Sequence, residues 1–342
     1  MPPSYNSLVP SSPQQRILVT GGAGYIGSTT VFELADAGYD VVVVDNLSRG
    51  HRERVERARL REVDLLDTQA LIQVMNEKAC AAVIHFAAYI AVGESMKIPE
   101  VYFRNNVAGS LSLLTAMVET GVRNIVFSST AAVYGMPEIV PIAETAPYAP
   151  VNAYGESKVM VEKFLHWFGE IHGMRSICLR YFNASGADPA QRTGEDHDPE
   201  THLIPLLFRA IQTGQPVTLF GDDYPTPDGT CIRDYIHVTD LARAHITAVN
   251  ALNAGARSGH YNAGTGHGFS VKEVLSAVEE VTGRKVPYVI GPRREGDPPE
   301  LVADSTRLQK EMGWRPEHSS LHSIIETAWK WFSRHEASAV RA

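Results

Sequence analysis

A glycine-rich turn between two apolar segments lies close to the start of the chain. The segment Arg16–Thr20 has the composition of a buried strand, and Gly21-Gly-Ala-Gly-Tyr-Ile-Gly27 follows it, with a helix that ends at Gly38. A second apolar strand, residues 39–45, ends in the carboxylate of Asp45. Such glycines let the backbone approach a pyrophosphate at a helix N-terminus, and an acid at this point accepts hydrogen bonds from ribose hydroxyls. The segment therefore predicts an NAD-binding unit, with NAD preferred over NADP because Asp45 would repel a 2′-phosphate.

Strands and helices continue to alternate through the first half of the chain. Asn105-Asn106 begin or line a helix that runs to Gly121. Further strands are predicted up to Asp64-Leu65 and over residues 82–88, 124–130 and 175–181. Consecutive apolar strands separated by helices indicate a parallel sheet covered on both faces. The predicted fold class is α/β, with a doubly wound parallel sheet of the Rossmann type and a smaller C-terminal α/β substrate-binding domain.

The composition changes after residue 183, where glycine and proline become more frequent and the apolar segments shorten. We expect a disordered tail at residues 1–15 and an NAD-binding domain at 16–183, to which part of 235–265 returns. Residues 184–335 are expected to form mainly the substrate-binding domain. Within it, Ser270 and Glu273 have the spacing of a capping box, which predicts the start of a helix.

Ligands of a doubly wound sheet lie at the carboxyl ends of its strands. Several residues besides the glycine turn are predicted at these ends: Asp45, Asp64, Leu65, Phe86, Ala87, Ala88, Ser128, Thr130, Tyr181, Phe182 and Asn183. Their shared location is stronger evidence for a binding site than any single motif.

Tyr154 and Lys158 lie four residues apart at the start of a predicted helix, and therefore on one face of it. A free tyrosine titrates near ~10, and a neighbouring cation favours its ionised form. Thr130, at the end of the strand 124–130, can donate a hydrogen bond to the same oxygen or to a substrate hydroxyl. These three residues are predicted to move a proton on and off an alcohol.

Other charged residues were weighed as ligands. Arg233, Arg293 and Arg294, with Asp297, have the chemistry of a site for a second diphosphate and its sugar. The segment Glu195–His202 resembles a metal site in composition, but its spacing does not place the ligands on one helix face, so we expect a solvated acidic loop and no metal. His85, within an apolar strand, is expected to be a hydrogen-bonded core histidine.

The composition argues against several kinds of partner and cellular location. The net charge of −8 over 342 residues makes nucleic acid and anionic membrane surfaces poor partners. The apolar stretches are too short to span a bilayer, and the N-terminus lacks the pattern of a signal peptide. Three separated cysteines, Cys80, Cys178 and Cys231, favour reduced thiols in a cytoplasmic protein.

Taken together, these motifs resemble the extended short-chain dehydrogenase/reductase superfamily and, within it, the UDP-glucose 4-epimerase (UDP-galactose 4-epimerase) family. The likeness covers about residues 16–335. Its most specific part is the stretch from Phe220-Gly-Asp-Asp-Tyr-Pro-Thr-Pro-Asp-Gly-Thr230 to Arg233-Asp-Tyr-Ile-His-Val238. The resemblance implies an isomerase that interconverts UDP-glucose and UDP-galactose by transient oxidation at C4, with tightly held NAD. It also implies a homodimer formed through the helices that follow residues 100 and 152.

The resemblance assigns a role to each group of site residues. Tyr154, assisted by Thr130, takes the C4 hydroxyl proton, while Lys158 holds the nicotinamide ribose and keeps Tyr154 ionised. The implied cofactor-binding residues are Gly21, Gly24, Tyr25, Ile26, Gly27, Asp45, Asn46, Leu47, Ser48, Arg49, Gly50, Asp64, Leu65, Phe86, Ala87, Ala88, Tyr89, Ile90, Asn105, Ser128, Tyr154, Lys158, Tyr181 and Phe182. The implied substrate-binding residues are Thr130, Tyr154, Asn183, His202, Leu203, Thr218, Leu219, Phe220, Arg233, Arg294, Asp297 and Leu301.

Three positions depart from the family pattern. Ile90 stands where some members carry a lysine near the cofactor phosphates, and His202 stands where asparagine is familiar. Leu301 replaces a bulky tyrosine of some members, and a smaller wall there predicts room for the N-acetyl group of UDP-GlcNAc or UDP-GalNAc.

Three other functions were considered. A UDP-pentose (xylose/arabinose) 4-epimerase remains open. A nucleotide-sugar 4,6-dehydratase is disfavoured, because Ala131-Ala132 follow Thr130 where that family carries an Asp-Glu pair. A non-catalytic NAD-binding sensor would not need the intact Tyr154, Lys158 and Thr130.

Overall fold

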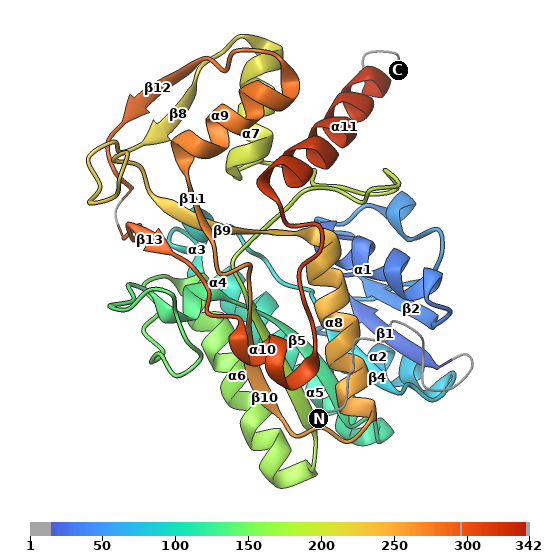
Figure 1. Cartoon of the computed structure of the whole chain (residues 1–342). Helices are drawn as coiled ribbons and strands as arrows, with labels where there is room; N and C mark the ends of the chain where they lie inside the picture. The colour runs from blue at the N-terminus through green and yellow to red at the C-terminus, as the bar shows by residue number, and fades with distance from the viewer. Residues whose placement is uncertain (1–14, 295, 340–342) are drawn as a thin grey trace.

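In the computed structural model, which describes residues 15–294 and 296–339, the largest element is a seven-stranded parallel sheet with the order β10-β6-β5-β4-β1-β2-β3 (Figure 1). Its strands are β1 Arg16–Thr20, β2 Asp40–Asp45, β3 Arg59–Glu62, β4 Ala82–His85, β5 Asn124–Thr130, β6 Arg175–Tyr181 and β10 Gly259–Ala263. The predicted α/β doubly wound class is confirmed. The predicted tail at residues 1–15 falls, except for Gln15, outside the described residues.

Helices cover both faces of this sheet. One face carries α1 (Tyr25–Asp36) and α8 (Val238–Asn253), and the other carries α2 (Thr68–Asn76), α5 (Gly109–Thr120) and α6 (Ala153–His172). Short helical segments complete this half: Arg52–Val55, α3 Val92–Ser95, α4 Pro99–Tyr102, Phe103–Ala108 and Ala131–Tyr134.

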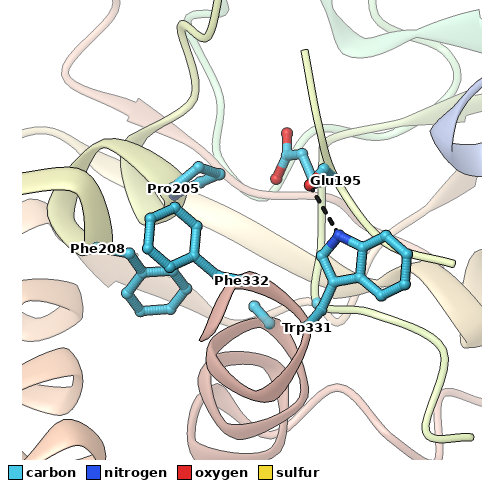
Figure 2. Close-up of a pocket in the computed structure, with 7 residues that line it drawn as sticks. Glu195, Pro205, Phe208, Trp331 and Phe332 are labelled. Atoms are coloured by element: carbon cyan, nitrogen blue, oxygen red, sulfur yellow. Dashed lines mark hydrogen bonds between the residues drawn. The ribbon is translucent and has the colours of Figure 1, made fainter. Parts of the chain in front are cut away.

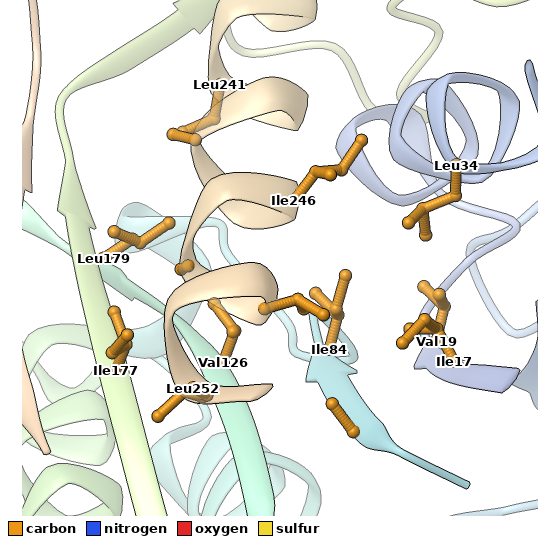
Figure 3. Close-up of a cluster of buried hydrophobic side chains, with 14 of the residues drawn as sticks. Ile17, Val19, Leu34, Ile84, Val126, Ile177, Leu179, Leu241, Ile246 and Leu252 are labelled. Atoms are coloured by element: carbon orange, nitrogen blue, oxygen red, sulfur yellow. The ribbon is translucent and has the colours of Figure 1, made fainter. Parts of the chain in front are cut away.

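Alternation along the strands explains why both faces are apolar. Ile17 and Val19 of β1 belong to the cluster beneath α1 and α8, whereas Leu18 belongs to the cluster on the opposite face. Figure 3 shows the first cluster, in which Leu241 and Ile246 of α8 lie over the strands. Burying a side chain of this size contributes about 1.5–3 kcal/mol. A sheet with two such clusters is held firmly enough to fix the loops at its carboxyl edge.

The second half of the chain contributes to this sheet before it builds its own layer. β10 pairs with β6, with Tyr261 opposite Leu179, and α8 packs on the sheet. These two elements fall within the residues 235–265 that we expected to return to the cofactor half. The exact domain boundaries remain a prediction.

The smaller region lies at the top of Figure 1. Its strands are β7 Asn183–Ser185, β8 Val217–Phe220, β9 Ile232–His237, β11 Gly268–Ser270, β12 Tyr288–Gly291 and β13 Glu300–Leu301. Its helices are α7 Leu203–Thr213, α9 Val271–Thr282 and α11 Leu321–Ala339, and α10 Thr306–Met312 lies beside β10. The capping box that opens α9 is confirmed, since Ser270 and Glu273 bond reciprocally. Ile204, Leu219, Val274 and Ile325 form part of its core.

Two strand ends differ from the prediction. β3 stops at Glu62, two residues before Asp64, because Asp64 Oδ1 accepts from Leu66 N at 2.9 Å and turns the chain. β4 stops at His85, because the backbone at Ala87 passes so close to Gly21 that a Cβ on that glycine would lie 2.5 Å from Ala87 N. Among the described residues, no helix is both long and apolar enough to cross a membrane.

Candidate active site

The glycine turn between β1 and α1 is shaped for close approach of a ligand. Gly21 has φ +70°, and a Cβ at Gly27 would lie 2.1 Å from the Gly21 carbonyl oxygen, so neither position tolerates a side chain. A Cβ at Gly24 would meet only the Gly21 oxygen, at 3.4 Å. Gly24 is the N-cap of α1, and no side chain within the described chain caps it. The first N–H groups of α1 therefore suit an anion such as a pyrophosphate.

The end of β2 carries the acid predicted for the ribose. Asp45 is 9% exposed, and its oxygens accept from Ala23 N at 3.0 Å and Leu47 N at 2.8 Å. Leu47 has φ +57°, so the loop turns sharply at the residue that bonds to the carboxylate. Burial raises the pKa of Asp45, although both bonds favour the ionised form. Each oxygen retains a further lone pair, which is the requirement for accepting ribose hydroxyls.

Other predicted cofactor residues lie in the loop that follows Asp45 and make contacts of their own. Asn46 Nδ2 donates to Asp64 Oδ2 at 3.0 Å, and Ser48 N donates to Asn46 Oδ1 at 3.1 Å. The Arg49 guanidinium lies 5.6 Å from the Tyr89 ring centre. A Cβ at Gly50 would lie 2.8 Å from Ala23 Cβ, so this glycine allows the loop to close over the turn. The arrangement is compatible with an adenosine site beside the glycine turn.

Asn106 is a positioning residue whose only signal in the sequence was the Asn105-Asn106 pair. Its side chain accepts from Tyr89 N at 2.8 Å and donates to Tyr89 O at 3.0 Å. It also donates to Ser157 Oγ on α6, while Asn105 Nδ2 donates to Asn106 Oδ1. Both asparagines lie in a π-helical turn, Phe103–Ala108, a type of irregularity that is common at functional sites. Asn106 thereby connects Tyr89, a predicted cofactor residue, to α6, the helix that carries Tyr154.

The three predicted catalytic residues are close together in the structure. β5 delivers Thr130, and the first turn of α6, capped by Asn152, delivers Tyr154 and Lys158. The Thr130 hydroxyl is close enough to the Tyr154 phenol to favour its ionised form. Lys158 Nζ lies 5.9 Å from the Tyr154 ring centre and donates to Ser128 O at 2.8 Å. Thr130, Tyr154 and Lys158 are each at most 8% exposed.

The electrostatics differ from our expectation that Lys158 lowers the pKa of Tyr154. Burial raises the pKa of Tyr154, with Tyr181 and Tyr102 adding to the rise and the Thr130 hydroxyl opposing it. Burial also lowers the pKa of Lys158 to about 7, with Glu162 opposing. The reason is geometric, since Nζ is directed at a backbone carbonyl and both groups are removed from water.

A buried ion pair links α6, the helix that carries Tyr154 and Lys158, to the strand β6. Arg180 of β6 and Glu162 of α6 are joined at 2.6 Å, and their side chains are 1% and 3% exposed. Ser129, between Ser128 and Thr130, donates to Glu162 Oε1 at 2.5 Å. The strand end that carries Thr130 is therefore bonded to the helix that carries Tyr154.

His85 is confirmed as a core histidine. Its Nδ1 lies 2.7 Å from Thr20 Oγ1, its Nε2 lies 2.8 Å from Ser110 Oγ, and burial lowers its pKa to about 3.

The predicted substrate residues come from several elements of the smaller region. β7 and β13 both pair with β9, so Asn183 is opposite Tyr235 and Leu301 is opposite Arg233. Arg233 forms an ion pair with Asp297. Thr218, Leu219 and Phe220 are on β8, and the Arg294 guanidinium lies 4.1 Å from the Phe220 ring centre. Leu203 begins α7 and packs with the core that contains Leu219.

The segment Glu195–His202 is not the solvated acidic loop that we predicted. The side chains of Glu195 and Glu200 are only 7% and 3% exposed, and His202 Nδ1 lies 2.5 Å from Glu195 Oε1. Tertiary contacts explain the difference: Trp331 Nε1 of α11 donates to Glu195 O at 3.1 Å (Figure 2), and the Tyr25 ring lies edge-on to the His197 ring, with 6.1 Å between the ring centres. His202 therefore faces these carboxylates.

Comparison with known proteins places the chain among nucleotide-sugar epimerases. Residues 17–264 match the model of the NAD dependent epimerase/dehydratase family. The UDP-glucose 4-epimerase of Lacticaseibacillus casei is 50% identical over 321 residues, which is 93% of this chain and 97% of that protein. The UDP-glucose 4-epimerase of Brucella ovis, solved in complex with NAD, is 47% identical with a TM-score of 0.91, covering 93% of this chain and 98% of that one. The UDP-Glc/GlcNAc 4-epimerase of Campylobacter jejuni is 38% identical with a TM-score of 0.82, covering 94% and 99%.

Proposed function

The chain belongs to the NAD dependent epimerase/dehydratase family, and we propose that it is an enzyme that interconverts UDP-glucose and UDP-galactose by transient oxidation at C4. The observation that carries this proposal is the proximity of Tyr154, Thr130 and Lys158 at the carboxyl edge of a sheet whose glycine turn suits a dinucleotide. A proton acceptor next to a cofactor cleft is what the oxidation of a secondary alcohol requires.

The chain's own residues then account for the movement of the proton. The Tyr154 oxygen takes the proton from the C4 hydroxyl, and Thr130 holds that hydroxyl and the phenol in one hydrogen-bonded line. When bound, NAD supplies the hydride acceptor and a positive charge that favours the phenolate against the effect of burial. Lys158 orients the nicotinamide ribose. After the 4-keto sugar turns, the hydride held by NAD would return to the opposite face of C4, the proton returns from Tyr154, and the configuration at C4 is inverted.

The substrate site is proposed to grip the nucleotide more firmly than the hexose. Arg233 and Arg294 would pair with the diphosphate, while Asp297 would pair with a hydroxyl. Asn183, Leu203 and the β8 residues Thr218, Leu219 and Phe220 complete the uridine side. An uncharged hexose pocket allows the ring to turn while the diphosphate stays fixed.

Two departures from the family pattern shape the expected properties. Ile90 is 40% exposed and brings no charge to the cofactor phosphates, so the grip on NAD is expected to be weaker than in members with a lysine. Leu301 packs beside Phe182 and Ala131, next to the strand end of Thr130. Its modest size supports turnover of UDP-GlcNAc and UDP-GalNAc as additional substrates.

We further propose a cytoplasmic homodimer. Cys80, Cys178 and Cys231 are free thiols, as expected in a reducing compartment. Leu111 of α5 is 42% exposed, and Trp167 and Ile171 of α6 are 60% and 69% exposed. Exposed large apolar groups on adjacent helices favour a contact between protomers. Val159, which we also weighed for this contact, is 2% exposed and packs within the protomer.

The decisive experiment is product analysis with the purified protein and no added cofactor. UDP-galactose should be converted to UDP-glucose, and denaturation of the protein should release NAD. The same assay with UDP-GalNAc and UDP-xylose separates the N-acetylated and pentose alternatives. A 4-keto-6-deoxy product would indicate a dehydratase, and bound NAD without turnover of any UDP-sugar would indicate a sensor. Either result would overturn the proposed function.

A further inference from the structure

Four side chains of one segment converge on a common point between the two halves of the molecule. Glu195, His197, Glu200 and His202 each offer one ligand atom, and these atoms lie within 4.8 Å of one another. His197 Nδ1 lies 3.3 Å from Glu195 Oε1 and 3.7 Å from Glu200 Oε2, and His202 Nδ1 lies 3.5 Å from Glu200 Oε1.

The two carboxylates of the cluster are buried, whereas the His202 side chain is 46% exposed, and two atoms of the cluster lack hydrogen bonds. The Glu195 side chain is 7% exposed, and its Oε1 has no hydrogen-bond partner although His202 Nδ1 is only 2.5 Å away. His197 Nδ1 is also buried without a hydrogen-bond partner. A carboxylate oxygen and an imidazole nitrogen this close need a positive charge beside them, which either an imidazolium proton or a bound metal ion supplies.

We propose that Glu195, His197, Glu200 and His202 bind a divalent cation, with Zn²⁺ as the best fit. Imidazole nitrogen and carboxylate oxygen are both zinc ligands, and two carboxylates neutralise the charge of the ion. Zn–N and Zn–O distances of about 2.0–2.2 Å in a tetrahedron place neighbouring ligand atoms roughly 3.3–3.5 Å apart. Three of the histidine–carboxylate separations, 3.3, 3.5 and 3.7 Å, are near this range, with Glu200 approached through both of its oxygens, and the 2.5 Å pair between His202 and Glu195 must open.

Protons compete with the metal for these ligands. Burial alone lowers the pKa of both imidazoles, but the two carboxylates outweigh it and raise the pKa of His197 to about 9 and that of His202 to about 10. Without metal the cluster therefore consists of two imidazolium–carboxylate pairs. Metal binding displaces these protons, as is usual for histidine sites.

The position of the cluster indicates a structural role. His197 packs against Tyr25 on α1, the helix that follows the glycine turn, and His202 is the N-cap of α7, which opens the smaller region. Four side-chain ligands leave no open coordination position for a substrate. The bound ion would fasten the cofactor half to the substrate half, independently of which sugar the enzyme converts.

The test uses the full-length protein without a histidine tag, after treatment with EDTA and removal of the chelator. Titration with Co²⁺ should give the intense visible absorption of a tetrahedral site at one equivalent per chain, and Zn²⁺ should abolish it. Zn²⁺ should also raise the melting temperature of the wild type. His197→Ala should weaken metal binding at least about tenfold and remove the stabilisation.

Control variants keep the result interpretable. His166→Ala changes an exposed histidine on α6 and should leave metal binding as in the wild type. Glu200→Gln gives a second, milder change if His197→Ala does not fold. The proposal is overturned if the wild type gives no tetrahedral cobalt spectrum, or if both cluster variants bind Zn²⁺ as tightly as the wild type. The four residues would then be ion pairs alone.

Discussion

At the scale of single residues, the proposal depends most on the phenolic oxygen of Tyr154. Tyr154→Phe removes only this oxygen from a side chain that is otherwise fully packed. We expect turnover of UDP-galactose to fall about 10²–10⁴-fold, the usual contribution of a positioned acid–base group, while bound NAD is retained. The measurement is kcat together with the NAD released on denaturation. Tyr288→Phe, at a 45% exposed position on β12, is the matched control and should stay fully active. An active Tyr154→Phe enzyme would show that another group takes the proton.

Lys158 gives a prediction about pH. Its pKa is lowered by burial to about 7, whereas an unfolded lysine titrates near ~10.4. Between these values the unfolded chain binds the extra proton, so this residue's contribution to stability increases as pH rises through 7. In nucleotide-free protein, the free energy of unfolding of the wild type relative to Lys158→Met should therefore increase from pH 6 to pH 8.5. Urea denaturation of both proteins at each pH measures this difference. A constant difference would mean that Lys158 stays charged when buried.

Most residues of the candidate site could be predicted from the sequence, but the directions of their pKa shifts could not. The glycine turn, Asp45, Thr130, Tyr154 and Lys158 are local patterns, and they come together because parallel strands end at one edge. The pKa of a buried group depends on the solvation of its side chain and on the direction of its hydrogen bonds. Neither can be read from spacing alone. The same limit explains the wrong prediction for residues 195–202, whose burial is caused by Tyr25 and Trp331, both distant in sequence.

At the scale of elements, the bounds of the central strands β5 and β6 were predictable, and the ends of β3 and β4 were not. β5 and β6 have the predicted bounds, because a long apolar segment fixes them. β3 is an exposed edge strand, Arg59–Glu62, and its end is set by the side-chain bond of Asp64. The end of β4 depends on the approach of Ala87 to Gly21, which is a tertiary contact.

The contact between β6 and α6 depends on the buried pair of Arg180 and Glu162. Burial alone raises the pKa of Glu162, but Arg180, Ser129 and Tyr148 outweigh it and lower the pKa, so the carboxylate is ionised at neutral pH. Glu162→Gln leaves the Arg180 charge buried without its partner, which typically costs about 3–5 kcal/mol. We expect a loss of stability of this size in urea denaturation.

A matched variant separates the effect of burial from that of charge. Glu326→Gln removes the carboxylate of an exposed i,i+4 pair with Lys330 and should leave the denaturation midpoint unchanged. The stabilisation from Glu162 should also disappear as pH falls below the ordinary carboxyl range. Equal midpoints for the two variants would show that the buried pair is not needed for stability.

At the scale of the whole molecule, the doubly wound arrangement follows from general rules for parallel sheets. The path of the chain from the smaller region back to the large sheet does not follow from them. Right-handed crossovers between parallel strands predict a doubly wound sheet. The return of part of residues 235–265 to this sheet was expected, but the pairing that places β10 beside β6, with Tyr261 opposite Leu179, is a long-range contact that no local pattern determines. The cofactor half is therefore completed by α8 and β10, which come after the first strands of the smaller region in the sequence.

The last prediction concerns the association of two protomers. Trp167, 60% exposed on α6, and Leu111, 42% exposed on the adjacent α5, offer apolar surface that a monomer would leave in water. A charge at the centre of such a contact is costly, because it must be desolvated without a partner. Trp167→Glu should therefore convert a dimer into a monomer in light scattering after gel filtration, with the circular dichroism spectrum unchanged. Tyr288→Glu, which adds the same charge to an exposed aromatic position on β12, should remain dimeric. A wild type with the mass of one chain at micromolar concentration would contradict the proposed assembly, and a dimeric Trp167→Glu variant would place the contact on another face.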